Sequence, residues 1–178
     1  MNLSRKNLYN LLVVQIKRLP AVLTLLLLGI ALAILLREPG HQYPAKVCFR
    51  DGVCVNADIA NTKENMTRGL MNRTEMPGDY GMLFVFPDEG DYVFWMKNTL
   101  IPLDIIWINS SKHIVHMEYA VPCIKDPCRI YRPDAKSVYV LEVNGRYAMK
   151  NNIAEGQKVE IYLLQPLSPI NGTNTQPP

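Results

Sequence analysis

The sequence of 178 residues lacks the motifs that mark several common chemistries. It has no G-x-S-x-G motif, so nothing predicts the exposed serine nucleophile of an α/β-hydrolase. Of its three histidines, His113 and His116 lie on one predicted strand, where their spacing turns them to opposite sides and prevents joint binding of one metal ion. No cofactor-binding loop is recognisable either. We therefore expect neither a metal nor a cofactor, and the sequence leans away from an enzyme.

Acidic residues are absent from the N-terminal segment, since Glu38 is the first of them. Arg5, Lys6, Lys17 and Arg18 precede it, and the other basic residues nearly balance the 16 acidic ones. The positive charge therefore belongs to the N-terminal segment alone. A nucleic-acid-binding domain needs a basic face, so nucleic acid is not expected as a partner.

Charge is also absent from residues 19–36, LPAVLTLLLLGIALAILL, where Thr24 is the one polar side chain. At about 1.5 Å per residue, a helix of this length spans roughly 27 Å, close to the hydrocarbon thickness of a bilayer. The basic residues on its N-terminal side predict that residues 1–18 stay in the cytoplasm and that the remainder is exported. We expect a single-pass signal anchor over 19–36 in the cell membrane, followed by a linker over 37–44.

A cleaved signal peptide is the alternative to the anchor, because Ala31-Leu32-Ala33 resembles a cleavage site. Apolar residues that continue to Leu36 favour the anchor. Cleavage would make the protein secreted, so both interpretations place the folded domain outside the cytoplasm.

The four cysteines form two local pairs. A loop over residues 50–52, with Gly52 in the left-handed conformation, would close a hairpin that sets Cys48 opposite Cys54. Cys123 and Cys128 would close a tight loop of their own. We predict two disulfides, as expected in an oxidising compartment, and a four-cysteine zinc site or free thiols are the alternatives. Four N-x-[ST] sequons in the part predicted to be exported are permissive for glycosylation, at Asn65, Asn72, Asn109 and Asn171.

Short strand-like runs separated by turn signals fill residues 45–165. They are predicted at 45–49, 53–59, 81–86, 92–96, 103–108, 113–119, 137–143 and 157–164. Helical segments are predicted at 64–71, with Thr62 as N-cap, and at 146–151. Because long crossovers between strands are not evident, the pattern favours an all-β sandwich or barrel. The proline-rich tail, 166–178, is predicted to be disordered.

A series of motifs now identifies a family. The chain reads RGLMNR at 68–73, GMLFVF at 81–86, FWMKNT at 94–99, IPLDI at 101–105, VLEVNG at 140–145 and EGQKV at 155–159. In this order the motifs resemble the DUF192 family, also called UPF0127, over about residues 46–164. The resemblance implies a jelly-roll-like β-sandwich and carries no settled reaction.

Glu142 is the acid that strand alternation places on an apolar face. A buried charge has to be paired or hydrogen-bonded, and Arg68, Arg73 and Lys97 are its candidate partners. These charges could simply tie loops to the sheet, which is the favoured interpretation. The functional interpretation is a cleft for a sugar or another polar ligand. That cleft would be lined by Arg68, Arg73, Trp95, Lys97, Asn98, Thr99, Asp104 and Glu142.

Two other chemistries are open. Asp104 and Glu142 could act as acid and base in a hydrolase or transferase of the cell envelope. Met71, Met82 and Met96 lie within the family motifs and could hold Cu(I), although core packing is favoured for them. Without a recognisable nucleophile, the sequence best fits a binding or interaction module at the cell envelope.

Overall fold

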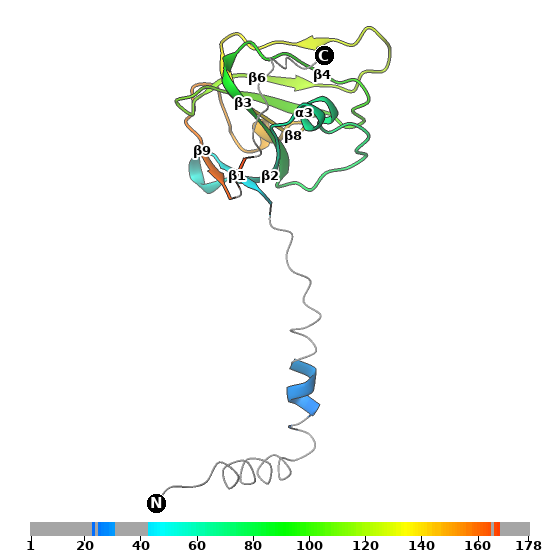
Figure 1. Cartoon of the computed structure of the whole chain (residues 1–178), viewed down its shortest axis with the longest axis vertical. Helices are drawn as coiled ribbons and strands as arrows, with labels where there is room; N and C mark the ends of the chain where they lie inside the picture. Colours follow the sequence, from blue (N-terminus) through cyan, green and yellow to red (C-terminus); the bar gives the residue numbers. More distant parts are fainter. Residues whose placement is uncertain (1–22, 24, 31–42, 165, 168–178) are drawn as a thin grey trace, which may run out of the picture. The chain divides into compact units, whose positions relative to one another are not determined.

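The computed structural model describes residues 23, 25–30, 43–164 and 166–167 (Figure 1). The chain divides into two units, Met1–Gln42 and Tyr43–Pro178. In the first unit, Leu23 and residues 25–30 are helical, and no helix among the described residues is long and apolar enough to cross a membrane. The predicted segment 1–18, and most of the anchor, linker and tail, lie outside the described residues and stay predictions.

The second unit consists mainly of β-strands (Figure 1). They are β1 (Ala45–Cys48), β2 (Cys54–Ala60), β3 (Tyr80–Gly90), β4 (Phe94–Trp95), β5 (Leu103–Ile108), β6 (Ile114–Ala120), β7 (Ile130–Tyr131), β8 (Ser137–Asn144) and β9 (Glu160–Leu163). Two short α-helices accompany them, α3 (Lys63–Arg68) and α4 (Tyr147–Lys150), together with the 3-10 turn η1 (Arg50–Gly52). The prediction of an all-β domain with short helices is confirmed.

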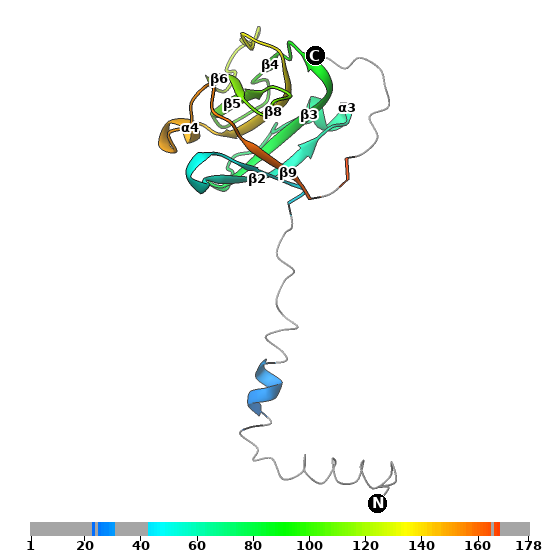
Figure 2. The ribbon, with the colours of Figure 1, turned by 90° about the vertical axis from the view of Figure 1, so that its left-hand side faces the viewer.

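One seven-stranded sheet forms the body of this unit, in the order β6-β5-β8-β3-β2-β1-β9, and β4 pairs with β7 in a separate ribbon. The sheet curls strongly (Figure 2). At one place its two ends meet, because His113 forms a bridge with Lys158 and the Ile114 N–H donates to the Gln157 carbonyl at 2.9 Å. The start of β6 is thereby joined to the segment before β9, which partly closes the sheet into a barrel.

One connection differs from the sequence-based expectation. β2 and β3 run parallel, in a register that extends from Asn56 opposite Tyr80 to Ala60 opposite Phe84. A parallel pair needs a long crossover, and residues 61–79 with α3 provide it. The expectation that such crossovers are absent was wrong, because most of this one is irregular chain without a helical hydrophobic pattern.

The sheet carries a separate apolar core on each face. The concave core includes Val47, Leu83, Ile106, Leu141 and Val143. The other face is covered by α3 and by the β4–β7 ribbon, whose buried side chains pack with those of β3, β5 and β8; this core includes Met66, Leu70, Phe84, Phe94, Ile105, Trp107, Tyr131 and Val140. Strand alternation therefore decides which core each side chain of the central strands joins.

Several local features were predicted correctly from the sequence. Cys48 lies directly opposite Cys54 in the β1–β2 hairpin and is bonded to it, and Cys123 is bonded to Cys128. No cysteine of the chain is free, which rules out a four-cysteine zinc site. The Thr62 hydroxyl accepts a hydrogen bond from the Asn65 N–H at 3.3 Å, so the predicted N-cap of α3 is confirmed.

Candidate functional site

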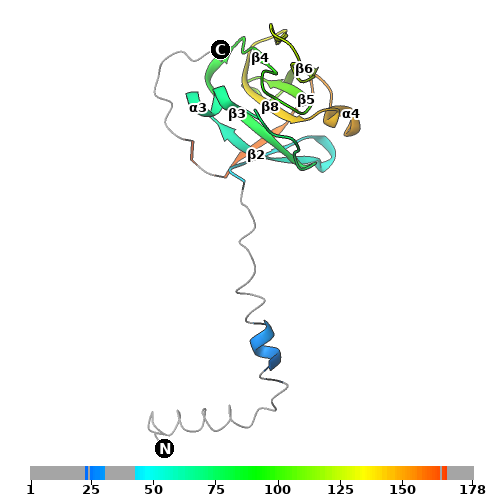
Figure 3. The same ribbon diagram turned by 90° about the vertical axis from the view of Figure 1, so that its right-hand side faces the viewer.

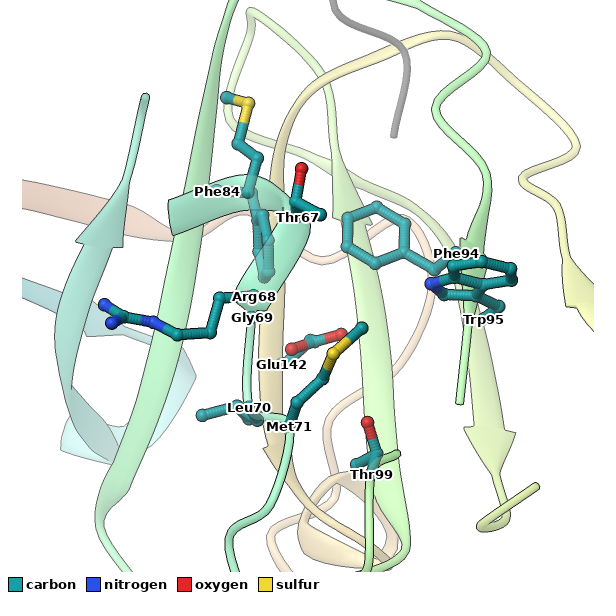
Figure 4. Close-up of a pocket in the computed structure, with 11 residues that line it drawn as sticks. Thr67, Arg68, Gly69, Leu70, Met71, Phe84, Phe94, Trp95, Thr99 and Glu142 are labelled. Carbon is teal, nitrogen blue, oxygen red and sulfur yellow. The ribbon is translucent and has the colours of Figure 1, made fainter. Parts of the chain in front are cut away.

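A small pocket lies where the end of α3 meets β3, β4 and β8 (Figure 4). Four of the family motifs supply its walls. RGLMNR gives Arg68, Gly69, Leu70 and Met71, GMLFVF gives Phe84, FWMKNT gives Phe94, Trp95 and Thr99, and VLEVNG gives Glu142. The cavity volume is about 30 Å³, which is room for one or two water molecules or for a single functional group of a ligand.

Glu142 is the unusual member of this pocket. Its exposed fraction is 5%, and on the sheet it lies between Met82 of β3 and Ile105 of β5, which offer it no polar atom. No described residue donates a hydrogen bond to its carboxyl group or forms an ion pair with it. Burial disfavours the charged form and raises the pKa of Glu142 to about 8. At neutral pH this side chain is therefore mostly a neutral acid that faces the cavity.

Gly69 opens the space beside this acid. It follows α3 with φ 44° and ψ −132°, a conformation that glycine adopts at little cost. A Cβ atom added there would lie 3.4 Å from Cζ of Phe84 and 3.9 Å from Oε2 of Glu142. Any side chain at this position would therefore intrude on the pocket, so the glycine of the RGLMNR motif keeps the carboxyl group accessible.

The polar turn of FWMKNT forms the rim and not the wall of the pocket, apart from Thr99. The Asn72 N–H donates to the Asn98 carbonyl at 2.8 Å, and both residues have a left-handed φ, of 62° and 57°. Nζ of Lys97 lies 3.6 Å from a carboxylate oxygen of Asp126 and 5.5 Å from the centre of the Trp95 ring. Asn98 and Lys97 thus hold the rim together without lining the cavity.

None of the three predicted cationic partners reaches Glu142. Arg68 donates to the side-chain carbonyl of Asn65 at 3.2 Å, and Figure 4 shows its guanidinium directed away from the acid. Lys97 is engaged by Asp126, as described above. The predicted pairing was wrong because each cation has another polar partner: Asn65 for Arg68, Asp126 for Lys97 and Asp58 for Arg73.

Arg73 belongs to a separate polar group. Its guanidinium donates to the Tyr80 hydroxyl at 2.9 Å and lies 3.6 Å from the Asp58 carboxylate, and the Tyr80 hydroxyl in turn donates to Asp58. Burial, followed by the hydrogen bond to Asp58, raises the pKa of Tyr80. This group ties the loop after α3 to β2, which agrees with the structural interpretation for Arg73.

Asp104 is also part of the framework. It lies opposite Val143 on β8, whereas its neighbour Ile105 lies opposite Glu142. Residues paired across two strands share a face, so Asp104 and Glu142 point to opposite faces of the sheet. Oδ1 of Asp104 accepts from the Arg146 N–H and Oδ2 from the Ala148 N–H, each at 2.8 Å.

Asp104 therefore satisfies two backbone donors at the start of α4, and it cannot serve with Glu142 as an acid–base pair at one substrate. Figure 3 shows the corresponding helices, α3 and α4, on opposite sides of the domain. Of the eight predicted site residues, the structure brings four together around the pocket: Arg68, Trp95, Thr99 and Glu142.

Sequence reasoning missed several lining residues, because their apolar side chains were assigned to the core. Met66, Met71, Phe84 and Phe94 line the pocket, and Figure 4 shows the Met71 thioether beside the Glu142 carboxyl. Met82 and Met96 are buried in the core, as expected for packing. The signal that could have found the pocket was the gathering of aromatic residues and methionines within the family motifs.

Comparisons with known proteins give a family and a fold. The model of the DUF192 family, described as "Uncharacterized ACR", matches residues 46–161. A crystal structure of a candidate transcription regulator from Sinorhizobium meliloti 1021 is similar at a TM-score of 0.58 and 30% identity, over 65% of this chain and 90% of that one.

A crystal structure of a protein of unknown function from Novosphingobium aromaticivorans DSM 12444 is similar at a TM-score of 0.60 and 31% identity, over 69% of this chain and 89% of that one. No curated protein matches the chain.

Proposed function

The chain belongs to the DUF192 family, and on that premise we propose that it is a membrane-anchored, extracytoplasmic binding module. The proposed site is the pocket of Glu142, which would receive one polar group of a small ligand. The observation that carries this proposal is an almost fully buried carboxyl group that faces a cavity and has no partner among the described residues.

A largely buried carboxyl group with a strongly shifted pKa in a cleft is a candidate for a functional site. Glu142 fits this description, and its pocket is lined mainly by four of the motifs that define the family resemblance. A purely structural acid would resemble Asp104, whose oxygens are both hydrogen-bonded.

The size of the pocket limits what it can take. A volume of about 30 Å³ admits the polar end of a molecule, such as an amine, hydroxyl or amide group, but not a whole sugar ring. We therefore propose that the remainder of the ligand lies outside, across the Trp95 and Lys97 rim. The sequence-based hypothesis of a cleft for a sugar or another polar ligand is therefore restricted to a site for one terminal polar group.

A series of protein-observed NMR titrations of the full chain in lipid nanodiscs tests the binding site. Methanol, acetamide and methylammonium are added while the ¹³C-methyl resonances of the methionines are followed. We expect at least one compound to shift the Met71 resonance saturably in the wild type and not in Glu142→Leu. Met149 of α4, 68% exposed, is the internal control. If none of the compounds affects Met71 in the wild type, the proposed site is wrong.

The proposed extracytoplasmic location rests on the charge distribution and on the disulfides. Arg5, Lys6, Lys17 and Arg18 precede the apolar segment 19–36, and disulfides persist mainly in oxidising compartments. C-terminal fusions in a bacterial host test this location. A fused alkaline phosphatase, which is active only after export, should be active, and a fused protein that fluoresces only in the cytoplasm should not fluoresce. The reverse pattern would place the domain in the cytoplasm.

Cu(I) is a second candidate for the same pocket, because thioether sulfurs are soft ligands and Met66 and Met71 both line it. Titration of the full chain with Cu(I) and ascorbate, against a chromophoric competitor, tests this candidate. Binding that is lost in Met71→Leu but kept in Met149→Leu would support it.

A further inference from the structure

We infer that the group which the Glu142 pocket receives is a primary ammonium, carried at the end of a small molecule. This inference rests on the proposed function and names the ligand class of the same site. Three features carry it: the balance of hydrogen-bonding groups, the aromatic walls, and the absence of a competing cation on the described residues that line the pocket.

The acceptors in the pocket suit a group with several N–H donors. Glu142 offers two carboxylate oxygens once it is ionised, and the Thr99 hydroxyl makes no hydrogen bond to a described residue although it is only 6% exposed. Figure 4 shows this hydroxyl on the side of Met71 and Glu142. An ammonium group has three donors and no acceptor, which matches these three oxygens.

Aromatic rings form the opposite wall. Phe84 and Phe94 pack edge to face, with centroids 4.9 Å apart, and Trp95 stands beside them. A ring face attracts a cation that lies over it, and this attraction is stronger where water is excluded. The Trp95 ring already accepts a cation within interaction range, since Nζ of Lys97 is 5.5 Å from its centre.

The pocket does not neutralise its own acid. Arg68 is the other charged side chain among the described lining residues, and it is held by Asn65 and directed away from the cavity. From the strands that flank Glu142, Met82 and Ile105 add no charge. A ligand cation is therefore free to form the ion pair that this carboxyl group lacks.

Binding of an ammonium group has to be coupled to loss of the Glu142 proton. Methylammonium stays charged well above neutral pH, so its affinity for the wild type should increase roughly tenfold for each unit that the pH rises toward 8 and should stay constant above pH 8. A neutral ligand that uses the protonated acid as a donor would show the opposite trend. The pH profile of the wild type therefore distinguishes the two classes without any substitution.

The decisive experiment compares methylammonium with methanol and acetamide on the full chain in nanodiscs, through the Met71 methyl resonance, in the wild type and in Glu142→Gln. Glutamine keeps the size and polarity of the acid but cannot ionise. We expect Glu142→Gln to lose at least tenfold in affinity for methylammonium and less than threefold for any neutral compound that binds.

The results distinguish a failure of the ammonium inference from a failure of the proposed binding function. If methanol or acetamide binds and methylammonium does not, or if methylammonium affinity is the same in Glu142→Gln or independent of pH, the ammonium inference is overturned while the binding site stands. If no compound binds the wild type, the proposed function itself is overturned.

Discussion

Two carboxyl groups on neighbouring strands of one sheet show how differently a fold can use a buried acid. Asp104 on β5 and Glu142 on β8 are each 5% exposed, and the strand register turns them to opposite faces. Asp104 accepts two backbone hydrogen bonds, whereas Glu142 has no partner among the described residues. Burial alone therefore does not define the role of an acid, and the surrounding donors do.

The family motifs also divide between the two acids: some surround Asp104 and the others form the pocket of Glu142. Gly145 of VLEVNG donates its N–H to the Pro102 carbonyl of IPLDI at 2.9 Å, and a Cβ there would lie 3.0 Å from that oxygen. These two motifs build the framework around Asp104. The remaining part of VLEVNG turns Glu142 toward the pocket formed with RGLMNR, GMLFVF and FWMKNT. One face of the sheet thus holds the proposed site, and the other holds a structural cap.

The largest expected effect concerns Glu142→Gln as a function of pH. Burial raises the pKa of Glu142 from 4.5 to about 8, so between these values the folded protein holds a proton that the unfolded chain has released. The free energy of unfolding of the wild type should fall by about 1.4 kcal/mol per pH unit in this range and not change further above it.

Glutamine lacks this dependence. The difference in stability between Glu142→Gln and the wild type should grow from near zero at pH 4.5 to a few kcal/mol at pH 8. Urea unfolding of the detergent-solubilised chain, followed by tryptophan fluorescence, measures it, since Trp107 is fully buried. A difference that is constant across this pH range would show that Glu142 is ionised in the fold and has a partner.

The second-largest expected effect concerns Asp104, the hydrogen-bonded acid of the pair. Asp104→Ala should reduce the free energy of unfolding by about 2–4 kcal/mol, because the Arg146 and Ala148 N–H groups lose their acceptor. Asp104→Asn keeps one acceptor oxygen and should lose roughly half as much. The same urea titration measures both, and a loss below about 0.5 kcal/mol for alanine would contradict the capping role.

Local features of this fold could be predicted from the sequence. The strand 103–108 has the predicted bounds, the Thr62 cap forms, and Cys48 and Cys54 face each other as the hairpin register required. Each of these depends on residues within a few positions of one another, where turn and cap chemistry is decisive.

Long-range relations could not be predicted. The parallel pairing of β2 with β3 and the register of β5 against β8 join segments far apart in the chain. That register alone decides that Asp104 and Glu142 point apart, so no local pattern could have separated the structural acid from the unpaired one. The partners of Arg68, Arg73 and Lys97 were mistaken for the same reason, since opposite charge indicates attraction but not distance.

The smallest effect isolates the polarity of the Glu142 side chain from its charge. At pH 4.5 the folded wild type and Glu142→Gln are both neutral at this position, and both place polar atoms in a largely buried site without a hydrogen bond to a described residue. Glu142→Leu removes those atoms, so it should be more stable than Glu142→Gln by about 1 kcal/mol, or a few degrees in Tm. Calorimetric or fluorescence-detected melting measures this difference. If leucine is instead less stable than glutamine, a polar side chain at position 142 stabilises the fold, as Asp104 does at its own position, and the contrast between the two faces disappears.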